Sequence, residues 1–344
     1  MSDAVSRPTA PRGATPLVGV WLIAVCVLVY AMILVGGATR LTDSGLSITE
    51  WKPISGVIPP LSDADWAHTF ALYQQTTEYQ HQNASMSLAE FRTLYWWEWG
   101  HRLLGRTTGL AIALPLLAFW RMGQLRGRLG RCLVLLALVG FEGVVGWWMV
   151  TSGLFSGLDV SPVRLAIHLS IAFVIIGYGL WLALVAFGWP AMPGSLGAPR
   201  WAPAAFLTVL LAQVILGALL AGADGGPAYP DWPTIGGHWI PPGLFELEPF
   251  ARNFVANHAM QHFAHRGLGY VVAASALAIG FAAARAGRGS AQRAGLALGG
   301  LALAQASLGV IVVVSGAPVG LSLAHQAGAA ALWLCAVATL KTSR

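Results

Sequence analysis

Long apolar runs alternate with polar connections along almost the whole chain. Eight of these runs approach or exceed the roughly 18–20 residues that an α-helix needs to cross a bilayer. The pattern predicts an all-α polytopic membrane protein with eight transmembrane helices. The runs centre on Val18–Val35, Leu103–Trp120, Cys132–Val150, Leu165–Phe187, Ala204–Leu220, Leu268–Ala284, Ala294–Val314 and Leu321–Leu340.

Two polar connections are long and resemble each other. The first, over residues 38–97, starts with a segment rich in Gly, Thr and Pro, which favours an ordered irregular loop. Amphipathic spacing over Trp66–Tyr79 and Ser87–Trp97 predicts short helices on the outer surface. The second, after the fifth span, repeats the order of a Trp-Pro pair, a Gly and an Ile-Pro-Pro run.

The two halves of the chain carry the same landmarks in the same order. The His-Arg pair that opens the second span recurs in the sixth, and a histidine early in the fourth span recurs in the eighth. Residues 17–189 and 203–341 are therefore predicted to be a duplication of four spans each, joined by a linker over 190–202. An even number of spans per half predicts parallel repeats, each a four-helix bundle of the kind that encloses a cofactor.

Composition and charge fix the environment and the orientation. With 56% hydrophobic and 10% charged residues, the chain is not a soluble globular protein. Basic residues collect in the N-terminal tail, after the even-numbered spans and at the C-terminus, so both termini are predicted to be cytoplasmic. Residues 1–16 are predicted to be a disordered tail. The net charge of +6 follows from this topology and gives no support for nucleic-acid binding.

Four histidines occupy matched positions near the outer ends of the even-numbered spans. Because these spans run in one direction, His101 is expected to face His168 across the first bundle, and His265 to face His325 across the second. Two opposed neutral imidazoles suit axial ligation of a heme iron, whereas zinc and di-iron centres use more ligands. A lone membrane histidine is as readily a packing residue, but four in matched positions favour ligation.

Two buried acids stand out beside these histidines. Glu98 lies three residues before His101, on the same helix face, and the second half has His262 at this position. An acid at the edge of a bilayer core is usually functional, so Glu98 is a candidate functional residue of the first half alone, and His262 can touch the second site. Glu142, aligned with Gln305, belongs either to a proton path or to a helix–helix hydrogen bond.

Five arginines lie near the level of the histidines. Arginine pairs bidentately with carboxylates, so these side chains are candidate partners for heme propionates or pocket residues. For each one, snorkelling to the membrane interface is the alternative. The five are Arg40, Arg102, Arg106, Arg164 and Arg266.

With these residues in view, the chain resembles the heme A synthases, membrane enzymes that oxidise heme O to heme A for terminal oxidases. The resemblance runs in order over residues 17–341. Some relatives carry a cysteine pair in the first outer loop, and its absence here resembles the branch shared by proteobacteria and mitochondria. The matching motifs are G-G-x-T-R-L-T-x-S-G-L-S at Gly36–Ser47, W-x-P-x-x-G at Trp51–Gly56, E-x-x-H-R-x-x-G-R at Glu98–Arg106 and A-Y-P-D-W-P-x-x-G-G-x-W-I-P-P at Ala228–Pro242.

The resemblance implies a division of labour between the halves. It implies a heme b cofactor between His265 and His325, and substrate heme O between His101 and His168 with Glu98 as the catalytic residue. The implied reaction turns the C8 methyl of heme O into a formyl group by two successive hydroxylations. The implied location is the bacterial cytoplasmic (inner) membrane rather than the mitochondrial one, with the heme sites toward the periplasm. Heme O synthase, a membrane electron acceptor and a second copy of the chain are candidate partners.

Three other functions fit part of the pattern. A diheme b-type cytochrome that exchanges electrons with quinone needs the same four histidines, and it differs in having no use for Glu98. A heme-handling assembly factor without chemistry is the second. A transporter built on parallel repeats is the third, and it leaves the histidines unexplained.

Overall fold

Eight helices in the described part of the chain are long and apolar enough to cross a bilayer, which confirms the predicted spans. The structure is a computed structural model that describes residues 15–190 and 196–343. Most of the predicted tail and part of the predicted linker therefore lie outside the described residues. The spans are α1 (Pro16–Leu41), α4 (Leu88–Arg121), α5 (Leu129–Ser156), α6 (Pro162–Ala186), α7 (Ala202–Gly222), α9 (His258–Ala286), α10 (Gly289–Val314) and α11 (Val319–Ser343).

The polar segments of the first outer connection differ from the prediction in two respects. The predicted surface helix over Ser87–Trp97 is the beginning of α4, because Ser87 and Glu90 form a capping box and no proline follows until Pro115. With 34 residues α4 is about 51 Å long, which exceeds the roughly 30 Å of a bilayer core. Its first turns therefore extend outside the membrane.

The other predicted surface helix, over Trp66–Tyr79, is divided in two. Helix α2 (Asp63–Tyr73) ends where the Thr76 hydroxyl donates to the Tyr73 carbonyl oxygen, and the same hydroxyl caps α3 (Thr77–Gln82). The remaining short elements are η1 (Ser55–Val57), η2 (Gly226–Ala228), η3 (Phe250–Arg252) and α8 (Asn253–Ala256).

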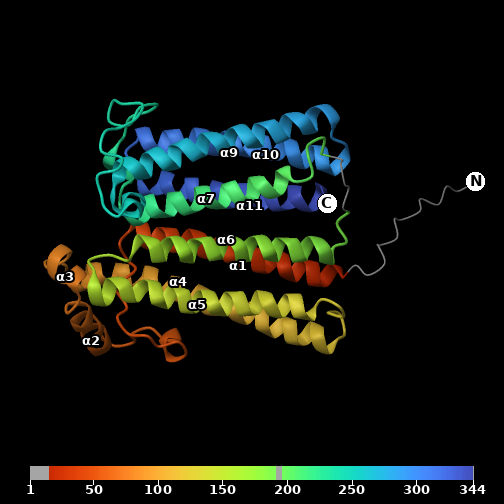
Figure 1. Cartoon of the computed structure of the whole chain (residues 1–344). Coiled ribbons are helices and arrows are strands. Elements are labelled where there is room, and N and C mark those ends of the chain that lie inside the picture. The colour runs from red at the N-terminus through yellow and green to blue at the C-terminus, as the bar shows by residue number, and fades with distance from the viewer. Residues whose placement is uncertain (1–14, 191–195, 344) are drawn as a thin grey trace, which may run out of the picture.

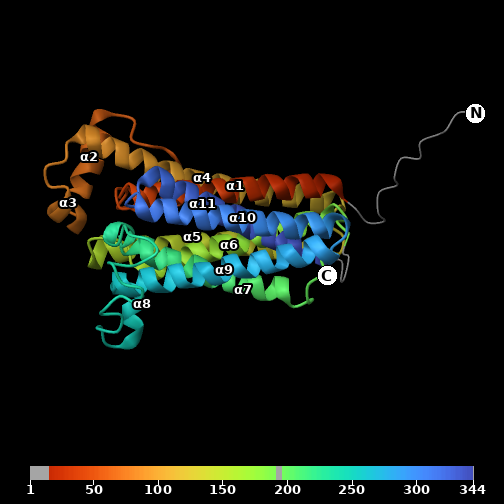
Figure 2. The ribbon, with the colours of Figure 1, turned by 90° about the horizontal axis from the view of Figure 1, so that it is seen from above.

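The spans pack as two groups of four. In the first group, α1 and α5 each contact both α4 and α6, and in the second group α7 and α10 each contact both α9 and α11. Helices α4 and α6 are therefore diagonal neighbours, as are α9 and α11. The groups meet where α6 contacts α7 and α11 and where α1 contacts α11. Figure 1 shows the two groups one above the other, and Figure 2 shows the same helices from above.

Both ends of the described chain lie at one end of the helices. The Thr15 amide donates to the Ala186 carbonyl oxygen over 2.8 Å, and Lys341 Nζ donates to the Trp189 carbonyl oxygen over 3.2 Å. The start of α1 and the ends of α6 and α11 are therefore neighbours, as an even number of spans requires. The loops after α1 and α7 lie at the opposite end (Figure 1).

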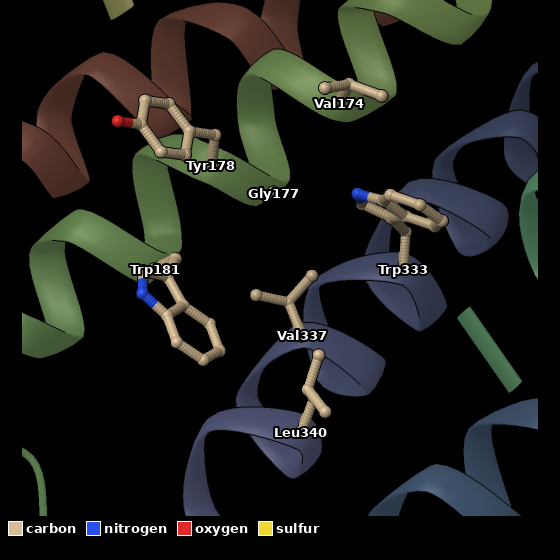
Figure 3. Close-up of a pocket in the computed structure, with 7 residues that line it drawn as sticks. All are labelled: Val174, Gly177, Tyr178, Trp181, Trp333, Val337 and Leu340. Carbon is tan, nitrogen blue, oxygen red and sulfur yellow. The ribbon is translucent and has the colours of Figure 1, made fainter. Parts of the chain in front are cut away.

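A tightly packed seam joins the two groups. Gly177 of α6 lets Trp333 of α11 approach, since a Cβ there would lie 2.6 Å from the indole nitrogen. Figure 3 shows a small apolar pocket on this seam, with Trp181 and Trp333 among its walls. None of the candidate heme ligands lines it.

The first outer connection has an aromatic core of its own. Trp66, Tyr73, Phe91 and Tyr95 are buried together between α2, α3 and the first turns of α4. The Tyr73 and Phe91 rings stack with their centroids 5.1 Å apart. This cluster holds the outer connection against the helix that carries Glu98.

A buried acid in this outer region predicts a pH-dependent stability. Glu78 of α3 is 2% exposed, and burial raises the pKa of its carboxyl to about 8. Between pH 4.5 and 8 the Glu78 carboxyl is ionised in the unfolded chain but keeps its proton in the folded chain. The free energy of unfolding therefore falls as the pH rises through this range. At about 1.4 kcal/mol per pKa unit, Glu78→Gln is expected to stabilise the protein by about 3 kcal/mol at pH 7.

Thermal unfolding at pH 5 and pH 7.5 measures this effect. The advantage of Glu78→Gln over the wild type should grow between the two pH values. Glu50→Gln, which removes an exposed ion pair with Lys52, should change stability little at either pH. A constant difference between Glu78→Gln and the wild type would contradict the prediction.

Candidate functional site

The four matched histidines lie on the diagonal helices of the two groups. His101 is on α4 and His168 on α6, the diagonal helices of the first group. His265 on α9 and His325 on α11 have the same relation in the second group. Each expected pair therefore lies on the two diagonal helices of its group.

Each imidazole rests on a glycine of a neighbouring helix. A Cβ at Gly217 would lie 2.9 Å from the His265 ring, and one at Gly309 would lie 3.0 Å from the His325 ring. Any larger residue would therefore push the ring aside. The corresponding distances are 3.1 Å for Gly36 and His101 and 3.0 Å for Gly146 and His168.

The residue four positions before each of these glycines contacts either the histidine itself or the helix turn that follows the histidine. Gln213 Nε2 lies 3.2 Å from His265 Nδ1, and Gln305 Nε2 lies 3.1 Å from His325 Nδ1. In the first group, Met32 packs where α4 has Gly105, and Glu142 Oε1 lies 3.0 Å from His168 Nδ1. Sequence reasoning aligned Glu142 with Gln305 but missed Gln213 and Met32, although all four precede the glycines by four residues.

Orphaned oxygens beside the rings fit metal-bound imidazoles. An imidazole that binds a metal through Nε2 carries its proton on Nδ1 and needs an acceptor there. The side-chain oxygens of Gln213 and Gln305 are buried without a hydrogen-bond partner, and so are both carboxylate oxygens of Glu142. In the structure the amide nitrogens face the rings and also donate to the backbone carbonyl oxygens of the histidines, over 3.0 Å from Gln213 to His265 and over 2.8 Å from Gln305 to His325. To accept from Nδ1, each amide has to turn and give up this bond.

Glu98 is buried between α4 and the first outer loop. It is 3% exposed, and its Oε2 accepts 2.7 Å hydrogen bonds from the Ser47 hydroxyl and the Ile48 amide. Its Oε1 accepts a 2.6 Å bond from Arg102, one turn further along the helix. The acid therefore holds the loop that follows α1 beside the helix face that carries His101.

His262 occupies the matching position in the second group. Arg266 donates to its Nδ1 over 2.9 Å, so its Nε2 carries the proton and donates to the Gly225 carbonyl oxygen over 2.7 Å. Both ring nitrogens are thus bonded within the protein. The Glu98–Arg102 and His262–Arg266 pairs fix the outer loops of their groups in the same manner.

The candidate arginines bond mainly to backbone carbonyls of the outer loops and helix ends. Arg102 donates to Ile48 and Glu50, and Arg106 donates to Lys52 and Pro53. Three of the arginines also keep one buried nitrogen without a partner, namely Nε of Arg40, Nη1 of Arg106 and Nε of Arg266. Arg40 donates to Asp43, Gly222 and Asp224. Arg164 donates to Trp148 and Thr151, and Arg266 donates to Tyr229, Asp231 and Thr234.

Asp231 stabilises the loop that Arg266 holds in the second group. Its carboxylate accepts hydrogen bonds from the amides of Gly236 and Gly237 and from the Thr234 hydroxyl. These bonds lower the pKa of the carboxyl to about 2, chiefly through the Gly237 amide. The loop therefore keeps its charged anchor throughout the physiological pH range.

Comparison with known proteins gives this site its context. The sequence profile of the COX15-CtaA family, described as cytochrome oxidase assembly protein, matches residues 19–337. The chain is 47% identical to a heme A synthase of Maricaulis maris (strain MCS10) over 328 residues, which are 95% of this chain and 96% of that one. It is 46% identical to a heme A synthase of Rhodopseudomonas palustris (strain BisA53) over 335 residues, 95% of this chain and 92% of that one. The resemblance found in the motifs is confirmed, and the chain belongs to the COX15-CtaA family of cytochrome oxidase assembly proteins.

Proposed function

We propose that the chain is an oxidoreductase that converts heme O into heme A for the assembly of terminal oxidases. Its relatives are heme A synthases that match it over nearly its whole length. The observation that carries the proposal within the molecule is the asymmetry of two similar histidine pairs. Only the first pair has a buried carboxylate, Glu98, one helical turn from a histidine.

In the proposed reaction, the C8 methyl of heme O is hydroxylated twice, and the resulting geminal diol loses water to leave a formyl group. His101 and His168 hold the substrate iron from opposite corners of the first group. Their glycine supports and the acceptor at Glu142 favour this role. The substrate is thereby fixed with its edge near the loop that Glu98 anchors.

Glu98 is proposed as the catalytic residue. Arg102 pairs with the carboxylate and orients it, and Ser47 and Ile48 hold it from the loop side. In this position the carboxylate can stabilise positive charge that develops at the oxidised methyl, or accept its proton. The buried surroundings strengthen either effect, because little water competes with the carboxylate.

His265 and His325 are proposed as the axial ligands of a heme b cofactor in the second group. The glycine supports and the orphaned oxygens of Gln213 and Gln305 fit this role. When bound, such a group supplies one-electron transfer. The residues of the second group bind it and keep it in an apolar environment.

The arginines with a spare buried donor are the strongest propionate candidates. These are Arg40, Arg106 and Arg266. Arg102, Arg164 and His262 are pocket residues that already bond to the loops and helix ends and have no buried donor left without a partner. Their proposed contribution is to hold the rims of the two sites.

We further propose that the two helix groups are parallel repeats with cytoplasmic termini, in the bacterial inner membrane, and with the heme sites toward the periplasm. The cationic connections at the end shared by the termini support this orientation. Heme O synthase, a membrane electron acceptor and a second copy of the chain are the proposed partners.

A glycine substitution tests the second site. Gly309→Ala places a Cβ 3.0 Å from the His325 ring, so the imidazole must move, and the heme b content of the purified protein is expected to fall severalfold. Gly300→Ala on the same helix meets no atom within 4 Å and should leave the heme content unchanged. Equal heme content in both variants would contradict the assignment of His325.

Expression in a bacterial strain that makes heme O but no heme A tests the function itself. Hemes extracted from the membranes should include heme A, separated chromatographically, only when the chain is present. Heme b bound to the purified protein without any heme A in the membranes would instead favour the diheme cytochrome.

A further inference from the structure

Three of the four histidine sites have a polar side chain against the imidazole, and one of these three is an acid. Gln213, Gln305 and Glu142 each lie one turn before the supporting glycine and approach Nδ1 of their histidine. The two second-group sites thus have neutral amides. The first group has a carboxylate at His168, and in the other site Met32 packs against Gly105, one turn after His101.

The carboxylate of Glu142 has His168 as its nearest polar neighbour. Its side chain is 14% exposed, and Oε1 lies 3.0 Å from His168 Nδ1. The contact is a close approach rather than a well-aligned hydrogen bond, and neither oxygen has another donor. The sequence left two roles open for this acid, a proton path or a hydrogen bond between helices. The contact favours the second role, because it joins Glu142 of α5 to His168 of α6.

If His168 binds a metal, its Nδ1 is the donor in this contact and Glu142 is the acceptor. With Nε2 on the iron, Nδ1 carries a proton and must donate it to an acceptor, which the carboxylate provides. A carboxylate acceptor makes the imidazole a stronger electron donor than an amide acceptor does. A stronger donor stabilises the ferric iron more than the ferrous iron.

We propose that Glu142 is a positioning residue for His168 and that its charge makes the first site favour ferric heme more strongly than the amide-supported second site does. This inference rests on the proposed function, since it requires heme O to bind between His101 and His168. The two groups would then differ in two ways, in the presence of Glu98 in the first group and in the charge beside His168. The iron at the first site therefore has the lower midpoint potential, so in its ferrous state it gives up an electron more readily than the iron at the second site does.

Exchange of the acid and the amide tests the proposal. Glu142→Gln keeps the shape and the acceptor and removes the charge. It is expected to lower the preference of the first site for ferric over ferrous heme O about tenfold, a rise of about 59 mV in the midpoint potential. Gln305→Glu should shift the potential of the second-site heme in the opposite direction. Glu142→Leu, which also removes the acceptor, should weaken ferric heme O binding about 10- to 100-fold.

The measurement is a potentiometric titration of the purified protein with heme O added, followed by its visible spectrum. In Glu142→Gln the second-site potential should remain at its wild-type value, which also shows that the variant is folded. An unchanged first-site potential, or an equal shift at both sites, would overturn the role of Glu142 alone. Failure of the wild-type first site to bind heme O would overturn the proposed function as well.

Discussion

Glu98→Ala is expected to reduce heme A formation at least about 100-fold while heme b stays bound. A positioned acid–base or electrostatic group contributes effects of this size. The proposed second site should not depend on Glu98, because its proposed ligands lie on α9 and α11. The measurement is chromatographic quantification of heme O, heme A and heme b from the purified variant.

Two further variants separate catalysis from support of the loop. Ser47→Ala removes one of the three hydrogen-bond donors to the carboxylate but leaves the acid, so its heme A output should stay near the wild-type level. Glu98→Gln keeps acceptors for Ser47 and Ile48 but has no charge, and it should be nearly as inactive as Glu98→Ala. Full activity of the glutamine variant would show that Glu98 only anchors the loop.

His265→Ala is expected to remove most of the proposed heme b, because the iron would lose one of its two proposed histidine ligands. The first group should remain folded and still bind heme O, since none of its helices contributes to the second site. The absorbance spectrum of the reduced protein measures the loss. His238→Ala, in an exposed loop outside both sites, is the control and should retain heme b.

An unchanged heme b spectrum in His265→Ala would contradict the assignment of the second site. Loss of heme b together with loss of heme O binding would indicate that the two sites are not structurally independent. Heme A formation is expected to stop in His265→Ala, since the first site would lose its proposed route for electrons.

The hydrophobic pattern predicted the spans well because a long apolar run in a bilayer is stable only as a helix, which satisfies its own backbone hydrogen bonds. The error at Ser87–Trp97 has a physical cause. In α4 a polar segment outside the membrane continues directly into an apolar segment inside it, and no proline separates the two. The change from polar to apolar residues predicted a helix end that the structure does not have. The expectation that the four histidines pair across each group came from topology alone, since connection order in an up-and-down bundle places its second and fourth helices on a diagonal.

The partners of the arginines were beyond the reach of sequence reasoning. Arg106 and Arg266 donate to backbone carbonyls, whose positions depend on the conformation of irregular loops. Gln213 was missed for another reason. A single amide in an apolar helix is ordinary, and only its spacing of four residues before Gly217 relates it to Gln305.

Electron paramagnetic resonance of the oxidised protein during titration with heme O tests the central claim of two bis-histidine sites. One low-spin signal is expected from the bound heme b, and a second should grow to equal intensity as heme O is added. In His101→Ala the second low-spin signal should be missing while the first persists. A single signal for which heme O and heme b compete would contradict two separate sites.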